Sequence, residues 1–191
     1  KTLDIFDLKL KYINIKGLNY LKKEKIIRKL ELKKTNSIFF INLDKIKKQI
    51  KTFPLVETVH IERILPNTLN IKINEKIPIG IIQENNTYKL ITKDKSILPT
   101  NNLQDFNHLP IFMGKGVEKN ANEILKLLTK VNFNEEIWSI NLINQRRWNL
   151  NLKKGVKILL PEENEEKALK IIIKIQKEYN VLDGNFIEVD L

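Results

Sequence analysis

The chain has 191 residues and a formal net charge of +11, with 42% hydrophobic and 30% charged residues. This length suits one large domain or two small ones, and the composition is that of a folded protein. No apolar run is long enough for a membrane helix, no signal-peptide pattern opens the chain, and the lack of cysteine excludes disulfides, zinc–thiolate sites and thiol catalysis.

The positive charge is concentrated in the first part of the chain. Residues 1–77 hold 18 Lys and Arg against 8 Asp and Glu, whereas residues 78–191 hold 16 against 15. This asymmetry indicates two domains and makes an anionic membrane surface a candidate partner of the first. Because nearly all the basic residues are lysine, nucleic-acid recognition through the bases is disfavoured. The alternative origin of the charge is a compositional drift of the whole sequence towards Ile, Lys and Asn.

Apolar spacing in residues 1–77 predicts the order strand, helix, helix, strand, strand. The expected elements are a strand at 10–15, a helix whose apolar face holds Leu21, Ile26, Ile27 and Leu30, a helix capped by Asn42 and stopped before Pro54, and a hairpin with strands at 58–62 and 69–74. Two helices covering one face of a three-stranded sheet form a stable two-layer domain.

Residues 78–191 show shorter apolar segments, which predict a mixed-sheet β domain with two helices. The expected strands are 79–83, 88–92, 96–98, 109–113, 137–143, 148–152, 156–160 and 186–191, and the expected helices are 118–131 and 162–179. The last helix should bury a stripe of Ala168, Ile172, Ile175 and Tyr179. The fold class is therefore α+β, with one domain at 1–77 and another at 78–191.

No pattern of catalytic or ligand-binding residues emerges. His60 and His108 each lack a second metal ligand at a suitable spacing, and the Gly114-Lys115-Gly116 turn lacks the remainder of a phosphate-binding loop. The glutamates at 162–166 suit the positive end of a helix dipole. We therefore expect no enzyme activity, no metal and no cofactor.

Three segments carry a more specific pattern. They are TFPLVETVHIERILPNTLNIKINEKIPIG at 52–80, LPIFMGKG at 109–116, and RRWNLNLKKGVKILLP at 146–161 with IEVDL at 187–191. In this order and at these distances, the chain resembles the FtsQ/DivIB family of bacterial cell-division proteins over nearly its whole length. Leu65 stands where the family usually has tryptophan, and Asp94-Lys95 stands where its hairpin usually has Asp-Gly.

The resemblance implies a POTRA domain followed by a β domain on the periplasmic side of the inner membrane. A single membrane helix would precede Lys1. It also implies a non-enzymatic scaffold that binds the divisome proteins FtsB and FtsL and takes part in the control of septal wall synthesis. Through its POTRA domain such a protein recruits other divisome proteins, at positions that match Thr58, Ile61 and Arg63 here. Ile61 fits the domain core equally well.

The same resemblance implies that the last strand pairs with a strand of FtsB by β-augmentation. That strand consists of Phe186, Ile187, Glu188, Val189, Asp190 and Leu191. Arg146 and Arg147 match family arginines that face acidic residues of the partner, although a solvated hairpin charge is the alternative for one of them. The rival classes are a POTRA-type translocation component, which needs repeated POTRA units and a membrane barrel, and a basic nucleic-acid-binding module.

Overall fold

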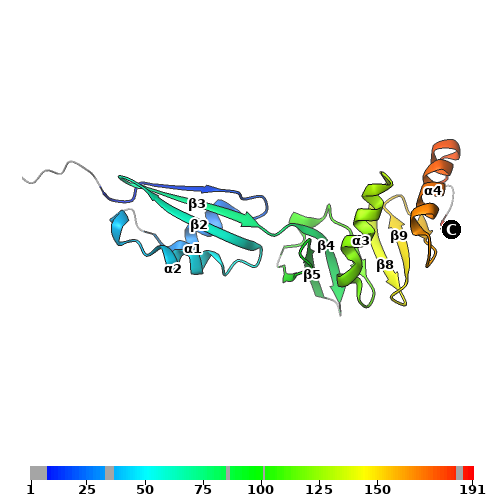
Figure 1. Cartoon of the computed structure of the whole chain (residues 1–191), viewed down its shortest axis with the longest axis horizontal. Coiled ribbons are helices and arrows are strands. Elements are labelled where there is room, and N and C mark those ends of the chain that lie inside the picture. The colour runs from blue at the N-terminus through cyan, green and yellow to red at the C-terminus, as the bar shows by residue number, and fades with distance from the viewer. Residues whose placement is uncertain (1–7, 33–36, 85–86, 101, 184–186) are drawn as a thin grey trace, which may run out of the picture. The chain divides into compact units, whose positions relative to one another are not determined.

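The computed structural model describes residues 8–32, 37–84, 87–100, 102–183 and 187–191. These residues form two compact units, divided between Ile77 and Pro78 (Figure 1). Each unit combines helices with a β-sheet, so the α+β class predicted from the sequence is confirmed.

The first unit has the predicted order of strands and helices, with one short 3-10 helix added between the two α-helices. Its described elements are β1 (Tyr12–Lys16), α1 (Lys23–Leu30), η1 (Ile38–Phe40), α2 (Leu43–Ile50), β2 (Val56–Ile64) and β3 (Thr68–Glu75). Within the described residues β3 lies at the centre of a three-stranded sheet, parallel to β1 and antiparallel to β2.

The core of the first unit lies between the two helices and one face of this sheet. Residues four positions apart on each helix, Ile26 with Leu30 and Ile46 with Ile50, are buried against Ile71 and its neighbours on β3. The side chain of Asn42 accepts a hydrogen bond from the Lys45 N–H at 2.9 Å and caps α2 as expected.

Ile27 was expected on the buried face of α1, and this prediction was wrong. Its side chain is partly exposed, at 37%. The helix is only two turns long, and a residue directly after Ile26 lies about 100° further round the helix than the buried stripe. Leu21 precedes the helix rather than belonging to it.

A buried carboxylate holds the connection between β1 and α1. Glu75, at the end of β3, is only 8% exposed and accepts backbone hydrogen bonds from Asn19 and Leu21 at 3.0 Å and from Tyr20 at 2.8 Å. Gly17 permits the close approach, because a Cβ atom there would lie 2.0 Å from the carbonyl oxygen of Ile73. The carboxylate thus satisfies three N–H groups in a loop that leads directly into α1.

The second unit contains a mixed sheet whose described strands have the order β11-β10-β9-β8-β7-β4-β5-β6. Its described elements are β4 (Pro78–Glu84), β5 (Thr87–Thr92), β6 (Ile97–Pro99), η2 (Gln104–Phe106), β7 (Ile111–Met113), α3 (Val117–Lys130), β8 (Ile137–Ile143), β9 (Arg147–Leu152), β10 (Lys157–Leu159), α4 (Glu165–Tyr179) and β11 (Glu188–Asp190). Helices α3 and α4 are crossovers, since each joins two adjacent parallel strands.

One row of apolar side chains crosses this sheet beneath the helices. The row follows the strand register from β4 to β11, and its members are Ile82, Phe112, Ile140, Leu150, Ile158 and Val189. Val189, at the edge, is partly buried, and the other five are buried. The row joins the helix residues Ile124 and Ile172 in one hydrophobic cluster.

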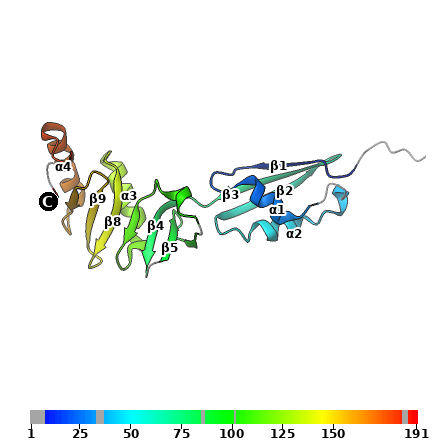
Figure 2. The ribbon, with the colours of Figure 1, turned by 180° about the vertical axis from the view of Figure 1, so that it is seen from behind.

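The predicted buried stripe of α4 is correct in its first half and wrong in its second. Ala168 and Ile172 are buried, and Leu169, which the prediction missed, is fully buried as well. Ile175 is half-buried, and Tyr179 is 69% exposed. The last turns of α4 extend beyond the sheet (Figures 1 and 2), so the helical spacing continues past the strands that bury its first half.

We expect the substitution Glu75→Ala to destabilise the first unit by about 2–3 kcal/mol, because three N–H groups lose a charged acceptor. The matched control is Glu57→Ala, which removes an exposed carboxylate from β2 and should cost under about 0.5 kcal/mol. Native-state hydrogen exchange at the amides of α1 and β1 would measure both effects in the whole chain. Similar losses for the two variants would contradict the anchoring role of Glu75.

Candidate partner-binding edge

The predicted terminal strand lies at one edge of the large sheet. Strand β11 pairs with β10 in parallel, with Glu188 opposite Lys157 and Asp190 opposite Leu159. Among the described residues β10 is the only strand beside it. Phe186, which was expected to begin this strand, lies outside the described residues, and Ile187 precedes the strand with its side chain 86% exposed.

Backbone hydrogen bonds show which residues of β11 face away from the sheet. The Lys157 N–H donates to the Ile187 carbonyl at 2.9 Å, and the Leu191 N–H donates to the Leu159 carbonyl at 3.2 Å. In a parallel pair, alternate residues of a strand direct both backbone groups to the same neighbour. The N–H and C=O groups of Glu188 and Asp190 therefore point to the outer edge.

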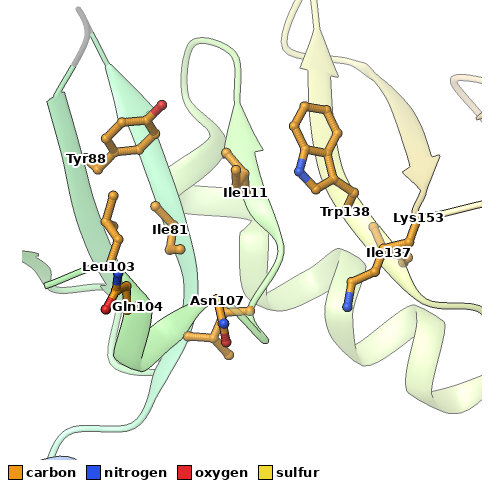
Figure 3. Close-up of a pocket in the computed structure, with 10 residues that line it drawn as sticks. Ile81, Tyr88, Leu103, Gln104, Asn107, Ile111, Ile137, Trp138 and Lys153 are labelled. Atoms are coloured by element: carbon orange, nitrogen blue, oxygen red, sulfur yellow. The ribbon is translucent and has the colours of Figure 1, made fainter. Parts of the chain in front are cut away.

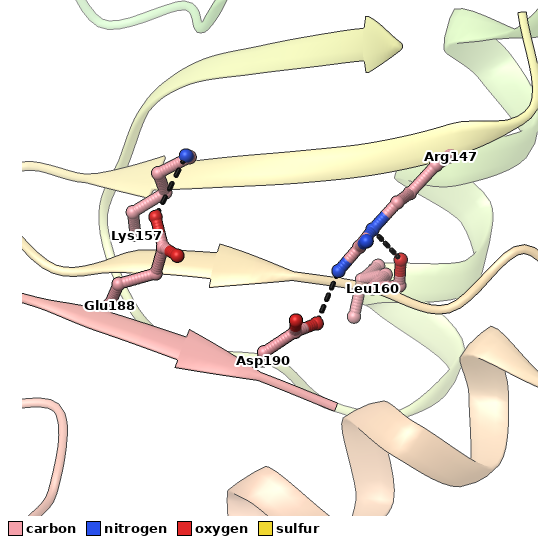
Figure 4. A network of polar contacts seen from close by, with 5 residues as sticks. All are labelled: Arg147, Lys157, Leu160, Glu188 and Asp190. Carbon is pink, nitrogen blue, oxygen red and sulfur yellow. Dashed lines mark hydrogen bonds and ion pairs between the residues drawn. The ribbon is translucent and has the colours of Figure 1, made fainter. Parts of the chain in front are cut away.

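The side chains of β11 alternate between the two faces of the sheet. Val189 packs against the hydrophobic cluster beneath the helices, and so does Leu191 just after the strand. On the opposite face, the Glu188 carboxylate accepts a hydrogen bond from Lys157 Nζ at 2.8 Å, and the Asp190 carboxylate pairs with the guanidinium of Arg147 (Figure 4). Apolar packing on one face and two ion pairs on the other hold the edge strand in place.

The two arginines predicted to face a partner have different surroundings. Arg147, at the start of β9, donates from Nε to the Leu160 carbonyl at 2.9 Å and also pairs with Asp190, so it connects β9 to β11 across the intervening segment. Arg146 lies in the turn before β9, and its side chain is 66% exposed with Nη1 3.5 Å from the carboxylate of Glu162. The structure therefore engages Arg147 within the chain and leaves most of Arg146 accessible.

The segment between α4 and β11 is anchored before the edge begins. Lys154 Nζ lies 2.6 Å from the Asp183 carboxylate and 3.1 Å from the Glu135 carboxylate. Hydrogen bonds to these two acids raise the pKa of Lys154, and the bond to Lys154 lowers the pKa of Asp183. Nearby, Leu182 is buried and its N–H donates to the Gln176 side chain at 2.6 Å.

The recruitment residues predicted in the first unit do not share one surface. Thr58 lies on the solvent face of β2, where its Oγ1 accepts a hydrogen bond from Asn74 at 2.8 Å. Ile61 lies half-buried against the core on the other face. Arg63 donates to the carbonyls of Ile38 at 2.9 Å and Ile41 at 2.6 Å. All three belong to β2, which is an edge strand of the described sheet.

The structure also contains an apolar pocket that the sequence analysis did not identify. It has a volume of about 390 Å³ and lies where the 103–109 segment meets the second unit's sheet (Figure 3). Its lining includes Ile81, Tyr88, Ile111 and Trp138, and Trp138 is 54% exposed. Such a pocket suits an apolar side chain of a partner. In the sequence the pocket is marked only by two aromatic residues, Tyr88 and Trp138, in predicted strands.

Neither a metal centre nor a membrane-crossing helix is found in the described part of the chain. No group of three or more His, Cys, Asp or Glu side chains there is arranged to hold a metal ion. No described helix is both long and apolar enough to cross a membrane.

Comparison with known proteins identifies both units. Residues 8–76 match the family model described as POTRA domain, FtsQ-type, and residues 80–191 match Cell division protein FtsQ/DivIB, C-terminal. The chain is 35% identical to the cell division protein FtsQ of Rickettsia bellii, an alignment that covers 100% of this chain and 72% of that protein. It is 33% identical to the Rickettsia felis FtsQ, with the same coverage.

Among solved structures, the chain is similar to the major extracytoplasmic domain of DivIB from Geobacillus stearothermophilus. The TM-score is 0.37 at 12% identity, covering 56% of this chain and 96% of that chain.

A POTRA unit followed by an FtsQ-type C-terminal unit defines a class of cell-division proteins. The chain belongs to the FtsQ/DivIB family, a family of non-catalytic divisome proteins, as its sequence motifs predict.

The ion pair between Arg147 and Asp190 should govern how tightly β11 is held. We expect Arg147→Glu and Asp190→Arg each to speed amide exchange at Leu191 several-fold, because each places two like charges together. The double variant restores opposite charges and should recover much of the protection. Lys174→Glu, on an exposed position of α4, is the control. A double variant that exchanges faster than both single variants would contradict this role.

Proposed function

We propose that this chain binds the divisome protein FtsB at the outer edge of β11, with FtsL as part of the same assembly. Through this binding the chain recruits or regulates septal wall synthesis. The observation that supports the proposal is the outward direction of the Glu188 and Asp190 backbone groups on a strand with a single described neighbour. Family membership supports a divisome role and disfavours the translocation and nucleic-acid alternatives.

The edge has the features that β-augmentation requires. An added strand gains affinity from main-chain hydrogen bonds, and β11 offers the N–H and C=O of two residues to such a strand. The strand is already held by Val189 on one face and by the Asp190 pair on the other, so little ordering is needed when a partner binds. An unpaired edge of this kind also promotes unwanted association unless a partner covers it.

The two arginines take different roles in this proposal. Arg147 positions β11 through Asp190 and the Leu160 carbonyl. Arg146 is the residue that meets an acidic side chain of the partner, since its side chain is mostly exposed and its Nη1 lies 3.5 Å from the carboxylate of Glu162. An exposed pair of this kind contributes mainly to selectivity and association rate.

We further propose that the chain lies on the periplasmic side of the inner membrane, in a protein with one membrane helix. The first unit recruits further divisome proteins along β2. Thr58 would contact such a partner from the solvent face, whereas Ile61 and Arg63 support the strand from the face that carries the helices.

The test of the edge uses proline at two neighbouring positions. Glu188→Pro removes a donor that points outward, so the chain should fold normally while its affinity for FtsB falls at least roughly tenfold. Val189→Pro removes a donor that faces β10 and disturbs the apolar row, so it should loosen β11 itself. Binding is measured by titration with purified FtsB, and folding by circular dichroism. A folded Glu188→Pro variant that binds FtsB as tightly as the parent chain would place the docking site elsewhere.

A charge reversal tests the contribution of the exposed arginine. Arg146→Glu should weaken FtsB binding by under about 1 kcal/mol and slow association, because the side chain lies at the rim of the edge. Lys126→Glu, on the exposed side of α3, is the matched control and should leave binding unchanged. An unchanged association rate for Arg146→Glu at low salt would remove Arg146 from the binding surface.

A further inference from the structure

We propose that one end of the POTRA unit inserts apolar side chains into the interface of an anionic lipid bilayer. This end, the apolar tip, consists of Tyr12, Phe39, Phe40, Ile64 and Leu65. The inference rests on the proposed placement of the chain beside the inner membrane.

Three separate segments meet at the apolar tip. The guanidinium of Arg63 binds the carbonyls of Ile38 and Ile41, which holds η1 against the end of β2. The Tyr12 N–H donates to the Asn67 carbonyl at 3.3 Å, which holds the start of β1 against the turn between β2 and β3. Figures 1 and 2 both show these segments at the same end of the first unit.

The side chains of the tip are directed away from the core. Phe40 is 90% exposed and Leu65 is 59% exposed, whereas Ile38 and Ile41 on either side of the two phenylalanines are buried. The chain therefore satisfies the core with isoleucines and presents aromatic rings outward from the same short helix. Several large apolar groups exposed together at one end indicate a surface that another apolar phase covers.

The charges around the tip favour a lipid interface as that phase. Lys9 and Lys11 are exposed next to the start of β1, and Lys45 lines the same groove as Phe40. Glu31 is the acidic residue in that groove, but residues 1–77 as a whole carry a net charge of +10. Aromatic and aliphatic side chains with lysines around them are typical of segments that lie in the headgroup region of anionic membranes.

The course of the chain agrees with this orientation. The Ile38 N–H donates to the Leu8 carbonyl at 2.8 Å, so the first described residues lie beside η1. A membrane helix that precedes residue 8, as proposed above, would bring the tip to the bilayer surface. Glu75 and the exit from the unit lie at the opposite end of the sheet, since Thr68 and Glu75 are the two ends of β3.

The first experiment measures co-sedimentation of the whole chain with phosphatidylcholine vesicles, with and without phosphatidylglycerol. We expect binding to the anionic vesicles, and we expect Phe40→Ser combined with Leu65→Ser to weaken it at least roughly tenfold, because binding scales with the apolar area that is inserted. Tyr179→Ser, which removes an exposed aromatic ring from α4, is the control and should bind as the parent does. Equal binding by the tip variant and the parent would overturn the proposal. This holds both if the two proteins bind anionic vesicles through charge alone and if neither of them binds.

The second experiment tests insertion directly. Tryptophan fluorescence of a Phe40→Trp variant should be quenched by anionic vesicles whose acyl chains carry bromine, well beyond the quenching of the parent's own tryptophans. If the Phe40→Trp variant shows no more quenching than the parent, the proposal is overturned. A protein partner would then be the alternative occupant of the tip. The tip variant should bind FtsB normally, so a failure of the lipid proposal is separable from a failure of the β11 proposal.

Discussion

The row of apolar side chains that crosses the large sheet is the interaction on which the second unit depends. It places one residue from each of six strands under α3 and α4, from Ile82 on β4 to Val189 on β11. Because α4 connects β10 to β11 in parallel, the chain must cross the face of the sheet before its last strand can pair. The burial of Leu169 and Ile172 on α4 thus determines that β11 arrives at the edge, with its outer side accessible.

The resulting edge strand, β11, is held in place on both faces of the sheet, but among the described strands it pairs only with β10. Val189 fixes the strand from the helix side, and the ion pairs of Glu188 and Asp190 fix it from the other side. Most surface ion pairs contribute little to stability, but the side chain of Arg147 is only 33% exposed and also bonds a main-chain carbonyl. The chain therefore uses charge to position a strand that has β10 as its one neighbour among the described strands.

The first unit is subject to a different constraint, because it consists of a small sheet and two short α-helices. Its core is made of few residues, so local constraints at its ends matter more. At one end the Glu75 carboxylate accepts hydrogen bonds from three N–H groups of the loop before α1. At the other end Arg63 donates to the carbonyls of Ile38, which begins η1, and of Ile41, which follows it. The second constraint also presents Phe40 outward, so the same hydrogen bonds that close the fold create the exposed apolar tip.

Much of the fold could be predicted from the sequence, because strand and helix periods are local properties. Alternation located β2, β3 and β8, Asn42 marked the start of α2, and the motifs at 52–80 and 146–161 identified the family. Only the tertiary structure decided that Tyr179 lies beyond the sheet and is exposed. It also decided that Arg147 pairs with Asp190, 43 positions later, and that the backbone groups of Glu188 point outward. These features depend on which distant segments of the chain lie side by side. The spacing of residues along the sequence reports local periodicity and does not show such long-range contacts.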